Sequence, residues 1–210
     1  MDIAVVDYGM GNLRSVSKAL EHVAPGATIK VTANPDDLRM AGRVVVPGQG
    51  AMPDCMRELE ARGLSDAVVE ASRTKPFLGI CIGLQMLFDY SEEGGVKGLG
   101  VLPGSVRRFT TGLADADGAR LKIPHMGWNK VAQKEPHVLW DAIADESRFY
   151  FVHSYYVAEQ EERLACGQSV YGLPFTVAVA RDNMFAVQFH PEKSQAAGLQ
   201  LLKNFVDWRP

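Results

Sequence analysis

The stretch Lys75-Pro76-Phe77-Leu78-Gly79-Ile80-Cys81-Ile82-Gly83-Leu84-Gln85-Met86-Leu87-Phe88 decides the fold. It begins as a short apolar run, passes through Gly-x-Cys-x-Gly, and continues as an apolar pattern with helical spacing. This order predicts a buried strand, a sharp turn that carries the cysteine, and a helix. Glycines two residues before and after Cys81 remove the Cβ atoms that would collide in so tight a turn.

Such a turn places Cys81 at the N-terminus of a helix, where the helix dipole favours the thiolate over the thiol. A cysteine in that position is a candidate nucleophile. The alternative is a buried structural cysteine in an ordinary strand–loop–helix connection. Gly-x-Cys-x-Gly alone does not distinguish these two interpretations, so the rest of the chain must decide.

Composition and charge exclude several classes of protein. The 210 residues suffice for one α/β domain spanning 1–210, with 47% hydrophobic and 22% charged residues as in soluble globular proteins. The formal net charge of -3 includes no basic surplus, so we expect neither nucleic acid nor an anionic membrane as a partner. The amino terminus lacks the features of a secretion signal, and no apolar run reaches membrane-spanning length.

The cysteines indicate a reducing compartment. Cys55, Cys81 and Cys166 are odd in number, widely spaced and without a C-x-x-C pair. This pattern is not that of a disulfide framework or a zinc site. We therefore expect a cytoplasmic protein that needs no metal and no cofactor.

The first half of the chain predicts a doubly wound α/β fold with a mostly parallel central sheet. Short apolar segments typical of strands alternate with segments typical of helices, and the strands are expected at 3–6, 27–31, 43–46 and 77–80. A helix with Asn12 as its cap is expected to reach about residue 22, and further helices are expected from about 34, from about 51 to 62, and over 64–72. In such sheets, ligand sites form at the carboxyl ends of the strands.

The second half predicts a smaller antiparallel extension, because strand-like segments follow one another without long helices between them. These strands are expected at 106–109, 121–123, 149–157, 166–171, 175–180 and 185–189. A polar surface loop is expected at 111–118. A closing helix is expected over 194–208, where Ala197, Leu201, Leu202 and Phe205 have helical spacing.

Two glycine-rich turns follow predicted strands. The turn Asp7-Tyr8-Gly9-Met10-Gly11-Asn12 is not a dinucleotide fingerprint, because Arg14 stands where the third glycine belongs. In the other turn, Gly48, Gln49 and Gly50 follow Pro47 and give a flexible backbone whose N–H groups can turn towards a ligand. A plain β-to-α turn is the alternative for this second segment.

The segment His190-Pro191-Glu192 supplies the base that a cysteine nucleophile requires. It follows a predicted strand, and a carboxylate bound to one ring nitrogen leaves the other nitrogen free for the thiol. Taken alone, it could equally be a surface turn. The Cys81 turn, the glycine loop and this segment together predict one shared site.

The three motifs, in this order, resemble the class I, triad-type, glutamine amidotransferase family, and the similarity covers essentially the whole chain. One branch of that family, the glutaminase subunits of histidine biosynthesis, is similar in three further stretches: Asp7 to Leu13, Pro124-His125-Met126-Gly127-Trp128-Asn129, and Tyr150 to Tyr155.

The resemblance implies hydrolysis of glutamine to glutamate and ammonia through a Cys81–His190–Glu192 triad and a γ-glutamyl thioester. It implies that backbone N–H groups of Ile82 and of the 48–50 loop hold the oxyanion. Contacts with the substrate glutamine are implied for Gln85, Ser154 and Tyr155. His153 is expected to point to the opposite face, because side chains alternate along a strand.

The resemblance also implies a partner, a (β/α)8-barrel cyclase subunit that forms a heterodimer with the chain and receives the ammonia through a channel. Interface positions implied in the same way are Asn12, Met126, Trp128 and Lys193. For Trp128 the alternative is a core aromatic residue, and for Lys193 it is a solvated charge.

Two other functions stay open at this point. One is a glutaminase subunit of another synthase, of the pyridoxal phosphate or anthranilate type. The other is a homologue that binds a partner without catalysis. The intact Cys81, His190 and Glu192 weigh against the latter.

Overall fold

The computed structural model describes residues 1–210. Its central sheet runs in the order β2-β1-β3-β4-β14-β13-β11-β7-β5-β6. The first five of these strands are parallel, which confirms the predicted parallel half. Their bounds are Ile29–Thr32 (β2), Ile3–Val6 (β1), Arg43–Gly48 (β3), Phe77–Cys81 (β4) and Met184–Val187 (β14).

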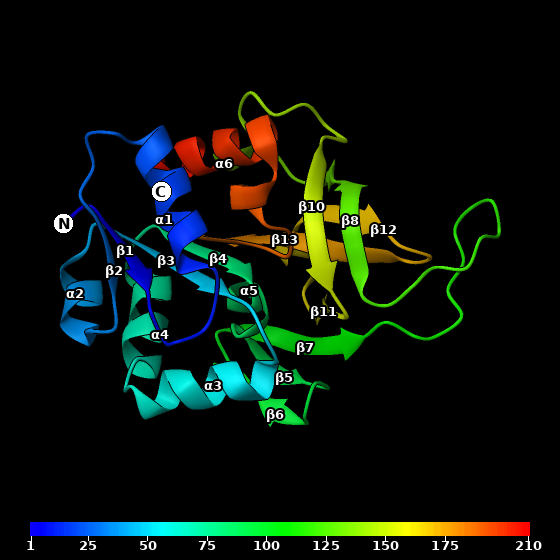
Figure 1. Ribbon diagram of the computed structural model, residues 1–210, viewed down its shortest axis with the longest axis horizontal. Helices are drawn as coiled ribbons and strands as arrows, with labels where there is room; N and C mark the ends of the chain where they lie inside the picture. Colours follow the sequence, from blue (N-terminus) through cyan, green and yellow to red (C-terminus); the bar gives the residue numbers. More distant parts are fainter.

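Helices cover both faces of the parallel strands (Figure 1). α1 and α6 lie above the sheet in that view, and α3 and α4 lie below it. Every residue of β1, β4 and β14 is buried, because these strands are covered on both sides. The helices span Leu13–Val23 (α1), Pro35–Met40 (α2), Met52–Ala61 (α3), Ser65–Thr74 (α4) and Gln195–Asp207 (α6).

The predicted antiparallel extension is confirmed. β13, β11 and β7 continue the sheet in antiparallel pairs, and β8 and β10 form a separate antiparallel pair. The strands of this part are β5 Phe88–Ser91, β6 Val96–Lys97, β7 Leu102–Arg108, β8 His125–Lys130, β9 Ala132–Gln133, β10 Arg148–His153, β11 Tyr155–Glu159, β12 Ala165–Val170 and β13 Pro174–Arg181. Three short 3-10 turns are η1 Val138–Trp140, η2 Glu162–Leu164 and η3 Pro191–Lys193.

A single cluster of 55 buried residues forms the core and extends from the parallel strands into the extension. The connection from β7 to β8 leaves the body of the molecule (Figure 1), and most of the predicted loop 111–118 is exposed. None of the helices has both the length and the apolar character needed to cross a membrane.

Three local predictions were wrong. The helix after Cys81 is only α5, Ile82–Gln85, and Phe88 already starts β5. Met86, Leu87 and Phe88 are all buried, and a short buried apolar run has no periodicity that separates helix from strand. Residues 121–123 form no strand, because the partner strand β10 pairs only from His125 onward.

The third error concerns the expected strand over 149–157. It is two strands that separate at Ser154 and pair with different neighbours: β10 with β8, and β11 with β7 and β13. A smaller difference lies at the start of α1. Asn12 precedes the helix as predicted, but its side chain forms no capping hydrogen bond.

Candidate active site

Three neighbouring strands bring the three predicted motifs to one edge of the sheet. β4 lies between β3 and β14, with Gly48 directly beside Cys81 and Val187 beside Ile80. His190 follows β14 by three residues and therefore lies at the same edge. The carboxyl ends of parallel strands thus assemble the site, as expected for this class of sheet.

Cys81 occupies a strained turn between β4 and α5. Its φ of 56° and ψ of -107° are rare for a residue with a Cβ atom, and the residue is 4% exposed. A Cβ on Gly79 would lie 2.7 Å from the carbonyl oxygen of Gly83, and one on Gly83 would overlap the carbonyl oxygen of Val46. Both glycines are therefore required by the close approach of backbone to backbone.

His190 and Glu192 form a buried pair beside Cys81. The imidazole Nδ1 donates to the Glu192 Oε1 at 2.9 Å, and the two side chains are 2% and 1% exposed. The Nε2 atom has no hydrogen-bond partner in the protein. Burial opposes the charged imidazole, but the Cys81 sulfur and the Glu192 carboxylate outweigh it and raise the pKa of His190 to about 10. The site therefore favours the charged imidazolium form of His190 beside the sulfur.

A cavity of about 380 Å³ opens beside this pair. Its walls include Cys81 and His190 together with six of the residues expected to bind substrate or oxyanion: Gln49, Gly50, Ile82, Gln85, Ser154 and Tyr155. Gly48 is not on the wall. It lies beside Cys81, and a Cβ at Gly48 would come within 2.6 Å of both the Ile82 Cβ and the Tyr8 hydroxyl oxygen.

The prediction missed Glu93, which lines the same cavity. The Glu93 Oε2 accepts from the backbone N–H of Met52 at 2.9 Å, so it caps the start of α3. In the sequence Glu93 lies in a polar loop, and no local pattern distinguishes it from the neighbouring Glu92. Its place at the site depends on the turn after β5, which packs against Met52 and Pro53 at the start of α3.

His153 also lies on the cavity wall, together with its neighbours Val152, Ser154 and Tyr155. Its ring packs against Phe109, Phe151 and Phe175. The imidazole Nδ1 donates to the carbonyl oxygen of Tyr155 at 2.8 Å. Burial is the main cause that lowers the pKa of His153 to about 3, so its imidazole is neutral.

Of the four residues expected at a partner interface, three lie near one another. Met126 and Trp128 are 66% and 43% exposed on the same face of β8. The Trp128 ring lies 6.1 Å from that of Tyr150, and the Lys193 Nζ lies 5.9 Å from the Tyr150 ring centre. Asn12 directly precedes α1, and no hydrogen bond joins it to these residues. No group of three or more His, Cys, Asp or Glu side chains has a geometry that could hold a metal ion.

The site thus combines a strained cysteine at the end of a central parallel strand with a buried histidine–glutamate pair. Residues 4–208 match the family described as "Glutamine amidotransferase class-I", and the chain belongs to this family.

Full-length relatives belong to one branch of this family. The chain is 66% identical over 210 residues to "Imidazole glycerol phosphate synthase subunit HisH" of Nitrosospira multiformis, with 100% of this chain and 99% of the relative covered. It is 62% identical over 210 residues to the protein of the same name from Aromatoleum aromaticum, with the same coverage.

Solved structures agree on the fold. PurLQS from Thermotoga maritima matches with a TM-score of 0.74 at 18% identity, covering 98% of this chain and 97% of that one. A structure described as glutamine amidotransferase matches with a TM-score of 0.71 at 19% identity, covering 97% of each chain.

Proposed function

We propose that this chain is the glutaminase subunit of imidazole glycerol phosphate synthase, an enzyme of histidine biosynthesis. The observation that carries the proposal is the buried Cys81, held in a strained turn beside the His190–Glu192 pair. Full-length relatives at 66% and 62% identity favour this synthase over one of the pyridoxal phosphate or anthranilate type.

In the proposed reaction, the Cys81 thiolate attacks the side-chain carbonyl carbon of glutamine and forms a tetrahedral oxyanion. Backbone N–H groups of Ile82 and of the 48–50 loop stabilise this oxyanion. His190 gives its Nε2 proton to the leaving amine, ammonia departs, and a γ-glutamyl thioester remains on the sulfur. His190 then removes a proton from water, which attacks the thioester, and glutamate leaves as the thiol is regenerated. Glu192 keeps the imidazole oriented throughout.

The cavity also suits the other end of glutamine. The Gln85 Oε1 is buried without a hydrogen-bond partner, and such an acceptor is available for an N–H group of the substrate. Glu93 contributes a carboxylate to the wall, so we propose that it binds the α-ammonium group of glutamine. Ser154 and Tyr155 complete the wall on the side of β11.

We propose that the released ammonia passes to a (β/α)8-barrel cyclase that forms a heterodimer with this chain. In the cyclase, ammonia would react with a phosphoribulosyl-formimino aminoimidazole-carboxamide nucleotide. The products would be imidazole glycerol phosphate and the aminoimidazole-carboxamide ribotide. The exposed Met126 and Trp128, with Lys193 directly after the catalytic Glu192, support a partner surface at this edge of the sheet. Asn12 is assigned to the same surface. All three cysteines are free, which supports a cytoplasmic location.

The test is ammonia release from glutamine by Cys81→Ala in complex with the cyclase and its nucleotide substrate. We expect no turnover above background, with assembly of the two subunits unchanged. Cys166→Ala is the matched control, because Cys166 is also buried but lies on β12, away from the cavity. Retained glutaminase activity in Cys81→Ala would exclude this mechanism.

A second experiment addresses control by the partner. The flexible Gln49 peptide would form the oxyanion hole only when the cyclase is engaged. Glutaminase activity of the isolated chain should then be far below that of the complex with nucleotide bound. Equal rates in the two states would exclude this control.

A further inference from the structure

Gln188 is a buried polar residue that none of the sequence motifs explains. It lies between the end of β14 and His190, and it is 0% exposed. Its Nε2 lies 3.6 Å from the Cys81 Sγ, and its Oε1 accepts from the Gln85 Nε2 at 3.0 Å. Both polar ends of this amide are therefore bonded inside the active site.

A backbone carbonyl determines which end of the Gln188 amide faces the sulfur. The Tyr155 carbonyl oxygen can only accept, so the Gln85 group 3.2 Å from it is the NH2 group. The same NH2 group reaches Gln188, whose facing atom must then be its oxygen. The NH2 group of Gln188 is left to donate to Cys81.

We propose that Gln188 donates a hydrogen bond to the sulfur of Cys81 and stabilises its thiolate before glutamine arrives. This inference rests on the proposed role of Cys81 as nucleophile. Cys81 is only 4% exposed, so few water molecules can solvate a negative sulfur, and donors from the protein take their place. The His190 imidazolium supplies charge, and Gln188 supplies a directed N–H group.

The same Tyr155 carbonyl also accepts a hydrogen bond from the buried His153, which in turn bonds the buried His125. The His153 Nδ1 must carry the proton that it donates to this carbonyl, so its Nε2 accepts from the His125 Nδ1 at 2.9 Å. The His125 Nε2 in turn accepts from the Asn129 side chain at 3.3 Å.

Burial lowers the pKa of His125 to about 4, so both rings are neutral with one proton each, as this chain of bonds requires. The chain runs without a break from Asn129 on β8 to the sulfur of Cys81. It keeps the Gln188 amide from rotating.

The experiment measures alkylation of Cys81 by iodoacetamide across pH 5 to 10, read by mass spectrometry of the Cys81 peptide in the folded chain. Only the thiolate reacts, so the pH midpoint reports its stability. In Gln188→Leu we expect the midpoint to rise by about one pH unit, with alkylation about tenfold slower below both midpoints. Glutaminase kcat/KM of the complex should fall by a similar factor at neutral pH and recover at high pH.

Gln188→Met provides a second variant without a donor but with a flexible side chain that fills the same space, in case the Leu variant does not fold. Gln133→Leu is the matched control, because it removes a hydrogen bond to the Ile143 carbonyl far from the cavity. Its midpoint should equal that of the wild type. Unchanged midpoints in the folded Gln188 variants would overturn the inference.

Alkylation needs no turnover, so this result is independent of the Cys81→Ala test. Loss of activity in Cys81→Ala with unchanged midpoints in the Gln188 variants would reject the role of Gln188 and leave the proposed function standing.

Discussion

At the scale of single residues, the active site depends on backbone atoms that approach one another more closely than a side chain allows. Cys81 has a positive φ, and Gly79 and Gly83 pack backbone against backbone on either side of it. Such strain persists only where the surrounding structure holds it in place. Here the buried strands β3 and β14 flank β4 and hold the turn.

Gly83→Ala tests this close approach. The added Cβ would overlap the carbonyl oxygen of Val46, so β3 or the turn must move, and we expect a loss of about 1–3 kcal/mol in the free energy of unfolding. Urea denaturation measures it. Gly26→Ala is the matched control, because nothing lies within 4 Å of the added atom there. Equal stability of the two variants would contradict the close approach.

Glu192→Gln tests the orientation of His190. The change removes one of the charges that raise the pKa of His190, so the imidazolium loses its proton below the wild-type value of about 10. The amide can also favour the wrong tautomer, and we expect kcat to fall by roughly two to four orders of magnitude. Glutaminase assays of the complex across pH should show the alkaline limb at lower pH. Glu162→Gln on the exposed η2 turn should leave the profile unchanged.

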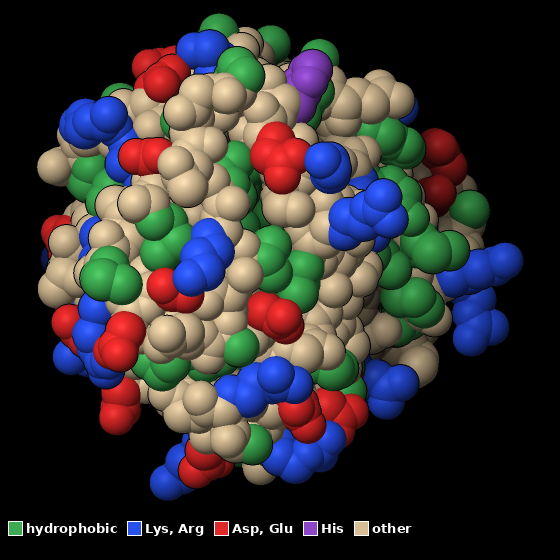
Figure 2. Space-filling view, turned by 60° about the vertical axis from the view of Figure 1, so that its left-hand side comes forward, with side chains coloured by type: hydrophobic (Ala, Val, Ile, Leu, Met, Phe, Trp, Pro, Cys, Tyr) green, Lys and Arg blue, Asp and Glu red, His purple; other side chains and the backbone are tan.

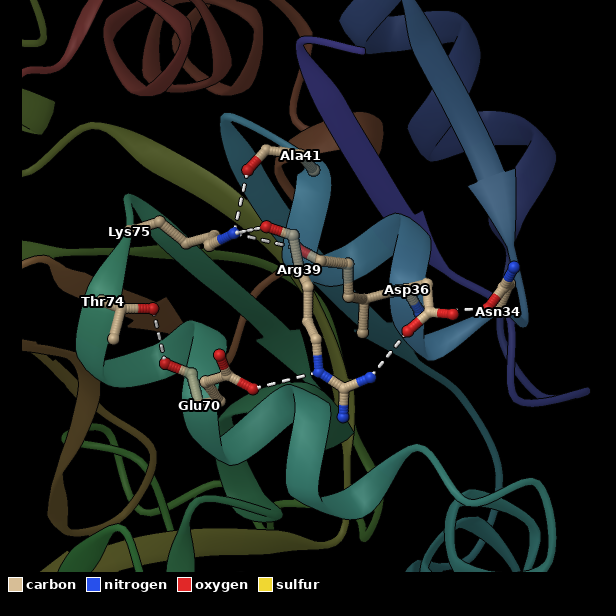
Figure 3. Close-up of polar contacts among 8 residues, drawn as sticks. Asn34, Asp36, Arg39, Ala41, Glu70, Thr74 and Lys75 are labelled. Carbon is tan, nitrogen blue, oxygen red and sulfur yellow. Dashed lines mark hydrogen bonds and ion pairs between the residues drawn. The ribbon is translucent and has the colours of Figure 1, made fainter.

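At the scale of elements, Lys75 ties the strand that carries the nucleophile to α2 (Figure 3). Its ammonium group donates to the carbonyl oxygens of Leu38, Arg39 and Ala41 at 3.0, 2.6 and 3.0 Å. These carbonyls lie at the C-terminal end of α2, where the helix dipole favours a cation. Burial lowers the pKa of Lys75.

Lys75→Met leaves these three carbonyl groups without their donor while retaining much of the side-chain volume. We expect a loss of about 1–3 kcal/mol in the free energy of unfolding. The glutaminase activity of the folded variant should change little, because Lys75 does not line the cavity. Chemical denaturation and a glutaminase assay of the complex measure both quantities. Lys134→Met removes an exposed lysine and should cost nothing measurable. A Lys75 variant as stable as this control would show that the three bonds contribute nothing.

At the scale of the whole molecule, charge is spread rather than gathered. Figure 2 shows acidic and basic side chains interspersed over one face, and the formal net charge is -3. Some ionisable groups are buried, among them His125 and His153, which are 3% and 6% exposed. Burial lowers their pKa values to about 4 and about 3.

Stability should therefore fall in mild acid. Below pH 6.5 the unfolded chain binds protons at these two histidines while the folded chain does not, so the free energy of unfolding decreases as pH falls from 6.5 towards 4. At pH 5 we expect a loss of about 2 kcal/mol for each imidazole. Urea denaturation at pH 7 and pH 5 measures it. His153→Gln should reduce the loss, whereas His22→Gln, at an exposed position, should not; equal losses in both variants would refute the assignment.

Local signals were enough to predict the parallel half of the sheet and the three motifs. Buried parallel strands are short apolar runs, and Gly79, Gly83 and the glycines of the 48–50 loop mark tight backbone that few other residues allow. The strands at 121–123 and 149–157 were predicted wrongly, because a strand also needs a partner, and pairing between distant segments leaves little mark on local sequence.

The sequence by itself determined the fold class, the family, and the identity of the proposed nucleophile, base and orienting carboxylate. Only the tertiary structure decided that Glu93 and His153 line the cavity, and that Gln188 donates to the sulfur of Cys81. The physical reason is that these roles depend on strand order and register, which bring residues as distant as Cys81 and Gln188 within hydrogen-bonding distance. The Tyr155 carbonyl, which can only accept, fixes which atom of Gln85 and of His153 donates to it. The orientation of Gln85 then fixes that of the Gln188 amide.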